Sequence, residues 1–475
     1  MASTPALKRS IRLRDLVLLY VVIVLSVRWT ATAAAAGPSI LVIWIAALLF
    51  FFIPLAASVM ELSSRHPEEG GIYIWTREAF GDFAAFIAAW AYWMSNLPFF
   101  ASVLYFGAAS ALFAFGARAQ SLASTPAYYI AFAVFWLGMI TLLNIVGIDT
   151  GRWLNNIGAF GSILPLGILM LMAAVSWVRF GPATHFTRAN MVPHWSFDNA
   201  VFWSGVFFAF SAIECASAMG DEMENPRRNV PWAILIGGSI LVIGYIGGTA
   251  ALLVALPSEA VGGPDGFVNG IHILANHLGL GWLLAPMALL VALNAVGGAA
   301  GNLSTTARLP FVAGVDRYLP AAFGSIHPRF RTPWVALAVY GGAGIVVALL
   351  GQAGTTVRGA YDVLVSMGVI SLFIPYLFLF AALIRLQSRP VGAGIRRVPG
   401  GKPVAIVLGS VGLLSTSITI LLSTIPGAEE TNKPLAIAKV LGGTALLVGL
   451  GVAVFLAERR KARAHIRPAI DAPLA

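Results

Sequence analysis

The feature that most constrains this chain is its series of long apolar blocks, each about twenty residues and bounded by charges, proline or glycine. A helix of that length crosses a hydrocarbon core of roughly 30 Å. The block from Ile40 to Ala57 is continuously apolar, whereas the strands of a membrane barrel alternate apolar and polar residues over about ten positions. The sequence therefore predicts membrane-spanning helices and excludes a barrel.

Composition agrees with a membrane protein. Of the 475 residues, 59% are hydrophobic and 11% are charged, against about 25% charged residues in a typical soluble domain. The predicted fold class is an all-α polytopic membrane protein with about twelve transmembrane helices. Their ranges are 13–36, 38–63, 81–115, 125–147, 153–178, 199–221, 231–256, 282–308, 333–352, 359–386, 403–424 and 434–457.

The basic residues predict the orientation of these helices. The net charge is +10, from 30 Lys and Arg against 20 Asp and Glu, and about 23 of the basic residues fall in alternate loops and both termini while about six fall in the others. This asymmetry predicts two cytoplasmic termini and explains the net charge without a nucleic-acid partner. Together with the Ala-, Gly- and Arg-rich composition, it points to the cytoplasmic membrane of a bacterium. The basic run 459–463 is expected to anchor the chain against anionic lipid.

Motifs for catalysis, metal ions and cofactors do not appear in the sequence. It has one cysteine, Cys215, which cannot form an internal disulfide. HExxH, the phosphate-binding P-loop and GxSxG are missing, and the seven His residues lie in predicted loops or near span ends. We therefore expect neither an enzyme nor a bound metal or cofactor.

Two predicted spans carry polar residues at mid-depth. Ser26 and Arg28 lie in the first span, and Ser211 and Glu214 lie in the sixth. A separation of five spans is expected when two five-helix halves of opposite topology form an inverted repeat, with a broken first helix in each half. Unwinding at 211–213 would free backbone groups there, and the start of the following half-helix would favour an anion such as a carboxylate. A zwitterionic amino acid suits such a site.

A charge inside a membrane costs about 2.5 to 3.5 kcal/mol on insertion scales, so Arg28 and Glu214 each need a partner or a function. Two interpretations are therefore open for each residue. Arg28 either attracts a substrate carboxylate or ties the helix to a carbonyl or a buried acid. Glu214 either exchanges protons at cytoplasmic pH or ties a broken helix to its neighbours.

Aromatic residues near these positions could gate a pocket, although most aromatics in a membrane bundle serve packing or the interfacial belt. The candidates are Trp29, Tyr92, Trp93, Trp203 and Phe208.

Three segments, in order, carry a family resemblance. The first, 61–81, contains Pro-Glu-Glu-Gly-Gly-Ile-Tyr-Ile-Trp followed by Ala-Phe-Gly; the second runs from Phe208 to Glu214 and continues with Glu-Asn-Pro-Arg-Arg-Asn-Val-Pro at 224–231; the third is 308–320 with Thr-Pro at 332–333. The chain resembles the amino acid, polyamine and organocation (APC) transporter superfamily, nearest to its amino acid permease and glutamate/GABA antiporter-like branch.

The resemblance implies a leucine-transporter-like fold of two inverted five-helix repeats with two further C-terminal helices. The implied segments are a cytoplasmic N-terminal tail 1–12, the first repeat 13–178, an extracytoplasmic loop 179–198, the second repeat 199–386, a cytoplasmic loop 387–402, the last two spans 403–457 and a cytoplasmic tail 458–475.

The resemblance also implies which residues serve the substrate, since relatives bind its carboxylate and amino groups at the unwound parts of the first and sixth helices. The implied substrate-binding residues are Val22, Ile23, Val24, Leu25, Ser26, Tyr92, Phe208, Ser211, Ala212, Ile213 and Asn302, and the implied gating or coupling residues are Arg28, Phe208 and Glu214. Phe208 occupies the place of the family's outer gate.

Two positions depart from the family pattern. Val-Ile-Val-Leu-Ser at 22–26 replaces the glycine-rich signature of the first helix, and Ser162 stands near the place where some relatives have a lysine in the fifth helix. The expected function is secondary amino acid transport by alternating access, as symport or antiport. A polyamine or organic-cation carrier and a non-transporting sensor of the same fold are the alternatives. The expected partners are a small amino acid or amine, protons and membrane lipid.

Overall fold

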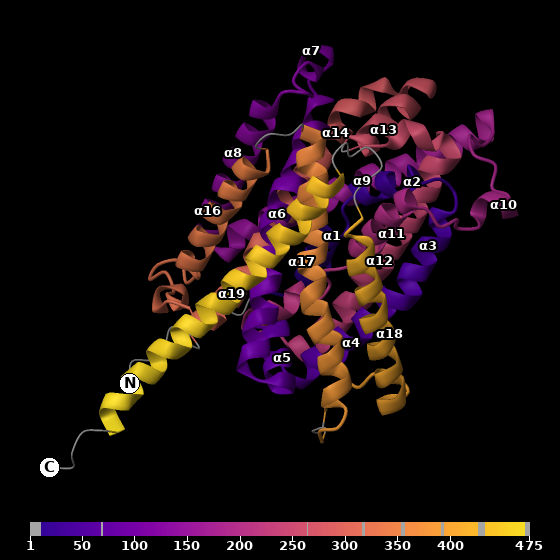
Figure 1. The fold of residues 1–475 in the computed structure, drawn as a ribbon. Coiled ribbons are helices and arrows are strands. Elements are labelled where there is room, and N and C mark those ends of the chain that lie inside the picture. The colour runs from indigo at the N-terminus through magenta and orange to yellow at the C-terminus, as the bar shows by residue number, and fades with distance from the viewer. Residues whose placement is uncertain are drawn as a thin grey trace.

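The computed structural model describes residues 11–67, 70–263, 265–315, 319–352, 357–390, 394–425 and 433–470. In these ranges the chain is helical, and most helices pack side by side in one bundle (Figure 1). An isolated parallel bridge between Ile11 and Met223 is the one β-pairing in the described ranges. Most of the predicted N-terminal tail, residues 1–10, lies outside the described residues. Part of the predicted C-terminal tail, residues 471–475, also lies outside them.

The helices follow the predicted ranges in order. They are α1 (Leu13–Val24), α2 (Arg28–Ala34), α3 (Ile40–Ala47), the π-helical turn η1 (Leu48–Phe52), α4 (Ile53–Arg65), α5 (Ile72–Phe80), α6 (Asp82–Leu112), α7 (Ala117–Gln120), α8 (Pro126–Val146), α9 (Ile148–Phe180), α10 (Arg188–Met191), α11 (Phe197–Ala209), η2 (Cys215–Glu222), α12 (Pro226–Ala255), η3 (Ser258–Val261), α13 (Gly266–His277), η4 (Gly281–Leu283), α14 (Leu284–Thr306), α15 (Arg308–Val315), η5 (Ala321–Gly324), α16 (Trp334–Gly351), α17 (Val357–Leu386), α18 (Gly401–Leu422) and α19 (Lys433–Ile470).

The chain is a polytopic helical membrane protein. Among the described residues, nine helices are long and apolar enough to cross a membrane, or ten if the bent pair α1 and α2 forms one span. Each of the predicted ranges contains a helix. Two of these helices are shorter than the length required of a membrane span. Helix α16 contributes an apolar stretch of only Trp334–Leu350, and α11 ends after 13 residues.

Figure 1 shows two ends of the bundle that matter for the site. Helix α5 lies at the lower end, and α13 lies at the upper end. Helix α2 packs against α13, whereas η2 approaches the turn before α5, where the Gly70 N–H donates to the Ala218 carbonyl at 3.4 Å. We refer to these as the α13 end and the α5 end.

Small residues bring α9 and α14 into direct contact. A Cβ at Gly161 would lie 2.3 Å from the Leu290 carbonyl oxygen, so only glycine permits this approach. The Asn294 side chain donates to the Gly158 carbonyl at 3.1 Å. Close backbone approach of this kind is a common source of helix association in membranes.

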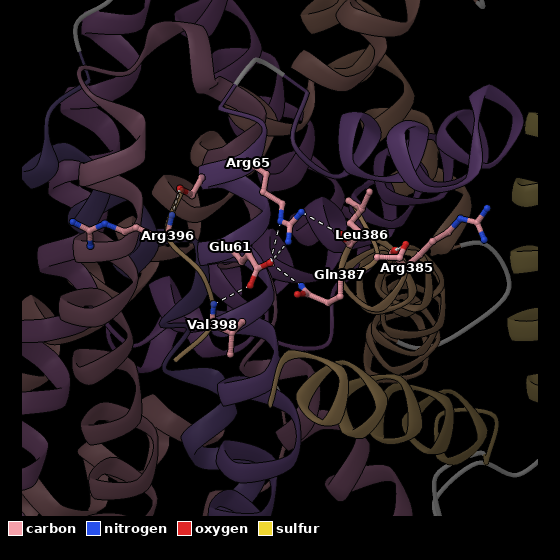
Figure 2. A network of polar contacts seen from close by, with 9 residues as sticks. Glu61, Arg65, Arg385, Leu386, Gln387, Arg396 and Val398 are labelled. Atoms are coloured by element: carbon pink, nitrogen blue, oxygen red, sulfur yellow. Dashed lines mark hydrogen bonds and ion pairs between the residues drawn. The ribbon is translucent and has the colours of Figure 1, made fainter. Parts of the chain in front are cut away.

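A buried carboxylate fixes the loop between α17 and α18 onto the end of α4 (Figure 2). Glu61 Oε1 accepts hydrogen bonds from Arg65 Nη2 at 2.6 Å and from Gln387 Nε2 at 2.7 Å. Its Oε2 accepts from the Val398 N–H at 2.8 Å, and Arg65 Nη1 donates to the Leu386 carbonyl at 3.1 Å. Each oxygen of Glu61 therefore has a partner, and the α5 end is held by a satisfied network.

Candidate functional site

The first span is broken close to the middle of the bundle. Helix α1 ends at Val24, α2 begins at Arg28, and the two axes are bent by 42°. The hydroxyl of Tyr245 accepts from the Ser26 N–H at 3.3 Å and donates to the Val24 carbonyl. Backbone groups freed inside a membrane need such partners.

The family resemblance implies that the first helix unwinds at 22–26, whereas the break in the structure begins three residues later and ends one residue later. Val22 and Ile23 are helical, and the break covers 25–27. The side chain of Val22 packs where α9 and α14 meet, against Gly158 and Gly297. The helix ends only where Tyr245 reaches the backbone.

The sixth span is broken where the sequence predicted. Helix α11 ends at Ala209 and η2 begins at Cys215, so Ser211–Ile213 lies outside both. Ala212 has φ 71°, a left-handed conformation that a residue with a Cβ adopts only when its surroundings impose it. The Tyr376 hydroxyl accepts from the Ala212 N–H at 2.7 Å and thereby stabilises this conformation.

Glu214 lies beside the second break and is held by two tyrosines. Its Oε1 accepts from the Tyr92 hydroxyl at 2.6 Å and from the Tyr376 hydroxyl at 2.8 Å. Its Oε2 is buried and makes no hydrogen bond in the described structure. Glu214 therefore joins α6 and α17 to the broken helix, while one of its oxygens is still able to carry a proton.

A small cavity lies between the two breaks. Its volume is about 30 Å³, and since one water needs roughly 10 to 15 Å³, the side chains must separate before an amino acid can enter. Its lining residues, all of them described, include none with a charge. They are Ile23, Val24, Ser26, Trp29, Ser95, Asn96, Phe99, Phe208, Ala209, Ser211, Ala212, Asn302, Gly368 and Leu372.

The predicted substrate residues divide into two groups. The structure places Ile23, Val24, Ser26, Phe208, Ser211, Ala212 and Asn302 on the cavity wall. The other predicted residues lie elsewhere: Val22 packs against α9 and α14, Leu25 packs against Gly244, Tyr92 bonds to Glu214, and Ile213 is buried away from the cavity.

Several wall residues were not predicted from the sequence. Ser95 and Asn96 of α6 are polar residues in an apolar span and lie within three residues of Pro98. Polar residues at such a position could have been recognised in the sequence. Phe99, Gly368 and Leu372 have no chemical feature that separates them from packing residues. They form part of the cavity wall because of the way in which α6 and α17 are rotated about their axes.

Aromatic rings close the cavity toward the α13 end. Phe208 meets Trp29 edge-on, with ring centroids 5.5 Å apart, and meets Phe373 at 6.2 Å. The position predicted to be an outer gate thus lies in a layer of rings next to α2.

Charges and hydroxyls close the protein toward the α5 end. Arg308 Nη2 lies 2.9 Å from Glu222 Oε1, and both side chains are buried. The same guanidinium donates from Nε to Glu222 Oε1 at 3.0 Å and from Nη1 to the Ser304 carbonyl. Ser63 and Ser217 share a hydrogen bond of 3.0 Å. Helix η2 is therefore tied to α4 and to the start of α15.

Arg28 is buried at the start of α2 and has weak polar contacts. Its Nη1 donates to Ser102 Oγ at 3.4 Å, and its Nε has no partner in the described structure. The guanidinium lies over the rings of Trp29, Phe99 and Tyr361, at 4.6, 5.5 and 5.9 Å from their centroids. Among the described side chains, no carboxylate pairs with it.

The fifth helix has no cation where some relatives have a lysine. Gly161 lies against α14, and the Ser162 hydroxyl donates to the Ala159 carbonyl of its own helix at 3.0 Å. No described residue can therefore take the role of that lysine from this position.

Comparison with known proteins supplies the family. The sequence model of the family described as "Amino acid permease" matches residues 12–446. An uncharacterized transporter of Legionella pneumophila is 26% identical over 93% of this chain and 95% of its own length. The glutamate/gamma-aminobutyrate antiporter of Lactococcus lactis is 24% identical over 80% of this chain and 77% of its own.

A probable agmatine/putrescine antiporter of the same bacterium is 25% identical over 61% of each chain. These relatives are transporters, which agrees with the resemblance carried by the three sequence motifs. Because the family model covers most of the chain, this multi-pass membrane protein belongs to the amino acid permease family and is a transporter of a small molecule rather than an enzyme.

Proposed function

We propose that the protein is a secondary active transporter of an amino acid that works by alternating access. The observation that carries this proposal is that two helix breaks line one small, uncharged cavity. The proposed architecture has two inverted five-helix repeats, 13–178 and 199–386, followed by two further spans. Symport and antiport are both consistent with this arrangement.

Backbone groups at the breaks would recognise the amino acid. Helix α1 ends and α2 begins at the cavity wall, so the partly negative end of one helix and the partly positive start of the other lie together. A zwitterion has an ammonium and a carboxylate to match them. The Ser26 hydroxyl is buried on this wall without a hydrogen-bond partner in the described structure and supplies a further polar group.

The two ends of the protein would open alternately. Phe208 and Trp29 would separate to admit substrate from the α13 side, and η2 would move away from α4 and α15 to release it on the other side. Glu214 lies between these gates and bonds to α6 and α17. It would therefore brace the break, or couple its movement to a proton.

A polyamine or organic-cation carrier is the second candidate, since one relative is named a probable agmatine/putrescine antiporter. A carrier of dications needs acidic groups on its pocket wall. The wall has none, and Tyr92 and Tyr376 hold Glu214 behind it. This geometry favours the amino acid.

Two measurements on the purified protein test the proposal. Thermal stabilisation is measured against amino acids, polyamines and their decarboxylation products, since a ligand at about 100 times its Kd adds roughly 2.7 kcal/mol. Flux of each stabilising compound is then measured in proteoliposomes. Binding without flux would indicate the sensor, and stabilisation by polyamines alone would indicate the cation carrier.

A paired substitution tests the position of the pocket. Ser211→Trp would fill the cavity and is expected to abolish both stabilisation and flux. Ser239→Trp is the control, because Ser239 is exposed on the outer face of α12. Normal transport by Ser211→Trp would refute this position.

A further inference from the structure

Three arginines with largely buried side chains differ in how their charge is compensated. Arg308 pairs with Glu222 at 2.9 Å, and Arg65 pairs with Glu61 at 2.6 Å. Arg28 is also buried, with 3% of its surface exposed, yet its one hydrogen bond to a described residue is to Ser102 at 3.4 Å. Within the described residues, it alone of the three has no carboxylate.

An unpaired cation inside a membrane protein is costly and usually marks a functional position. Three aromatic rings around the Arg28 guanidinium offset part of this cost. They leave Nε without any acceptor. The structural role considered from the sequence, a tie to a carbonyl or a buried acid, is not formed by any described residue.

Arg28 is also close to the cavity. Its guanidinium packs on Trp29 and Phe99, and both of these side chains form part of the cavity wall. The wall itself has no charged side chain. Because the cavity must widen to accept an amino acid, a turn of the Trp29 ring would bring the guanidinium and the substrate together.

We propose that Arg28 binds an anionic group on the substrate's side chain, so that the transported class is the acidic, dicarboxylic amino acids. This inference rests on the proposed transport function. The helix breaks would bind the α-amino and α-carboxylate groups, and Arg28 would bind the second carboxylate. A planar guanidinium suits a carboxylate better than an ammonium does, because it offers paired donors in a fixed geometry.

Binding to Arg28→Gln tests the assignment. Affinities of glutamate, serine and putrescine are measured by thermal shift and by inhibition of flux. We expect the wild type to prefer glutamate, and Arg28→Gln to lose roughly ten- to hundredfold in glutamate affinity, as expected for a hydrogen-bonded charge. Serine affinity should change little. Arg28→Lys should recover part of the loss, and Arg188→Gln, which removes an exposed charge from α10, should behave as the wild type.

The stability of the ligand-free protein supplies a second readout that does not depend on transport. Because no carboxylate among the described side chains pairs with Arg28, we expect Arg28→Met to keep or raise the melting temperature. Arg308→Met is the matched comparison and should lower it, because it strands the buried Glu222. A similar fall in both variants would overturn the proposal in favour of a structural role.

The remaining outcomes separate this inference from the transport function. Equal losses for glutamate and serine in Arg28→Gln would show that Arg28 binds the α-carboxylate common to both, which overturns the acidic class and leaves amino acid transport intact. Unchanged glutamate affinity in that variant, or a wild type that binds only serine, would do the same. A wild type that binds no amino acid would overturn both proposals.

Discussion

The two ends of the central cavity are closed by different chemistry. At the α5 end, Glu222 and Arg308 form a buried ion pair, and Glu61 has a hydrogen bond on each oxygen. At the α13 end, the closure is a contact between the rings of Trp29 and Phe208, beside Arg28, which pairs with no carboxylate that the structure describes.

This difference predicts unequal costs of opening. Separating a buried ion pair costs several kcal/mol, because each charge loses its partner in a medium of low polarity. Separating an aromatic pair costs about 0.5 to 1.5 kcal/mol beyond the area it buries. Under the proposed alternating-access mechanism, the α13 end would open through rotation of side chains, whereas opening the α5 end would require η2 to move and its charges to be hydrated.

The largest effect is expected from breaking the buried pair. Glu222→Ala leaves Arg308 charged and unpaired, so the free energy of unfolding should fall by about 3 to 5 kcal/mol. Thermal and denaturant unfolding of the purified protein in detergent measure it. Replacing both residues together, by Glu222→Met and Arg308→Leu, should recover most of the loss. Strictly additive losses would show that the two side chains do not stabilise one another.

A smaller loss of stability is expected at the centre, beside the break of the sixth span. Tyr376→Phe removes the acceptor of the Ala212 N–H and one donor to Glu214, and an unsatisfied buried group costs about 1 to 3 kcal/mol. Both stability and flux should fall. Tyr340→Phe is the control, since that buried hydroxyl donates to the Trp93 carbonyl at 2.9 Å, away from the break. If Tyr340→Phe impaired flux as strongly, the break would not be the sensitive element.

A still smaller effect is expected from removing the aromatic contact at the α13 end. Phe208→Leu removes the edge contact with Trp29, worth about 0.5 to 1.5 kcal/mol, and should accelerate release of labelled substrate up to about tenfold. Stability should change little. Phe135→Leu removes a similar ring pair with Trp136, at 5.3 Å on an exposed face of α8, and should leave the release rate unaltered. An unchanged rate in Phe208→Leu would argue against a gate at this position.

The smallest effect is expected from an exposed ion pair near the buried one. Arg12 and Glu224 lie 3.3 Å apart, with side chains 75% and 42% exposed, and such pairs contribute about 0 to 1 kcal/mol. Arg12→Gln should therefore unfold almost as the wild type does. A loss comparable to that of Glu222→Ala would mean that burial does not distinguish the two pairs.

Local patterns in the chain were enough to predict the helical membrane class and the break of the sixth span. Apolar blocks are contiguous, so their length and boundaries can be read without knowing any neighbour. The run Ser211–Ile213 lies before a carboxyl in an apolar segment. The cost of burying that carboxyl in a membrane can also be recognised from the neighbouring sequence alone. Phe208 and the other predicted residues on the cavity wall were instead implied by the family resemblance.

The break of the first span and the environments of the two ionisable residues were decided by tertiary structure. Tyr245, from α12, ends α1 at Val24, and Tyr92 and Tyr376 reach Glu214 from α6 and α17. Such partners come from distant parts of the chain, and the rotation of each helix sets which side chains meet. Whether a buried charge such as Arg28 is paired therefore depends on packing between helices, which one helix's sequence does not contain.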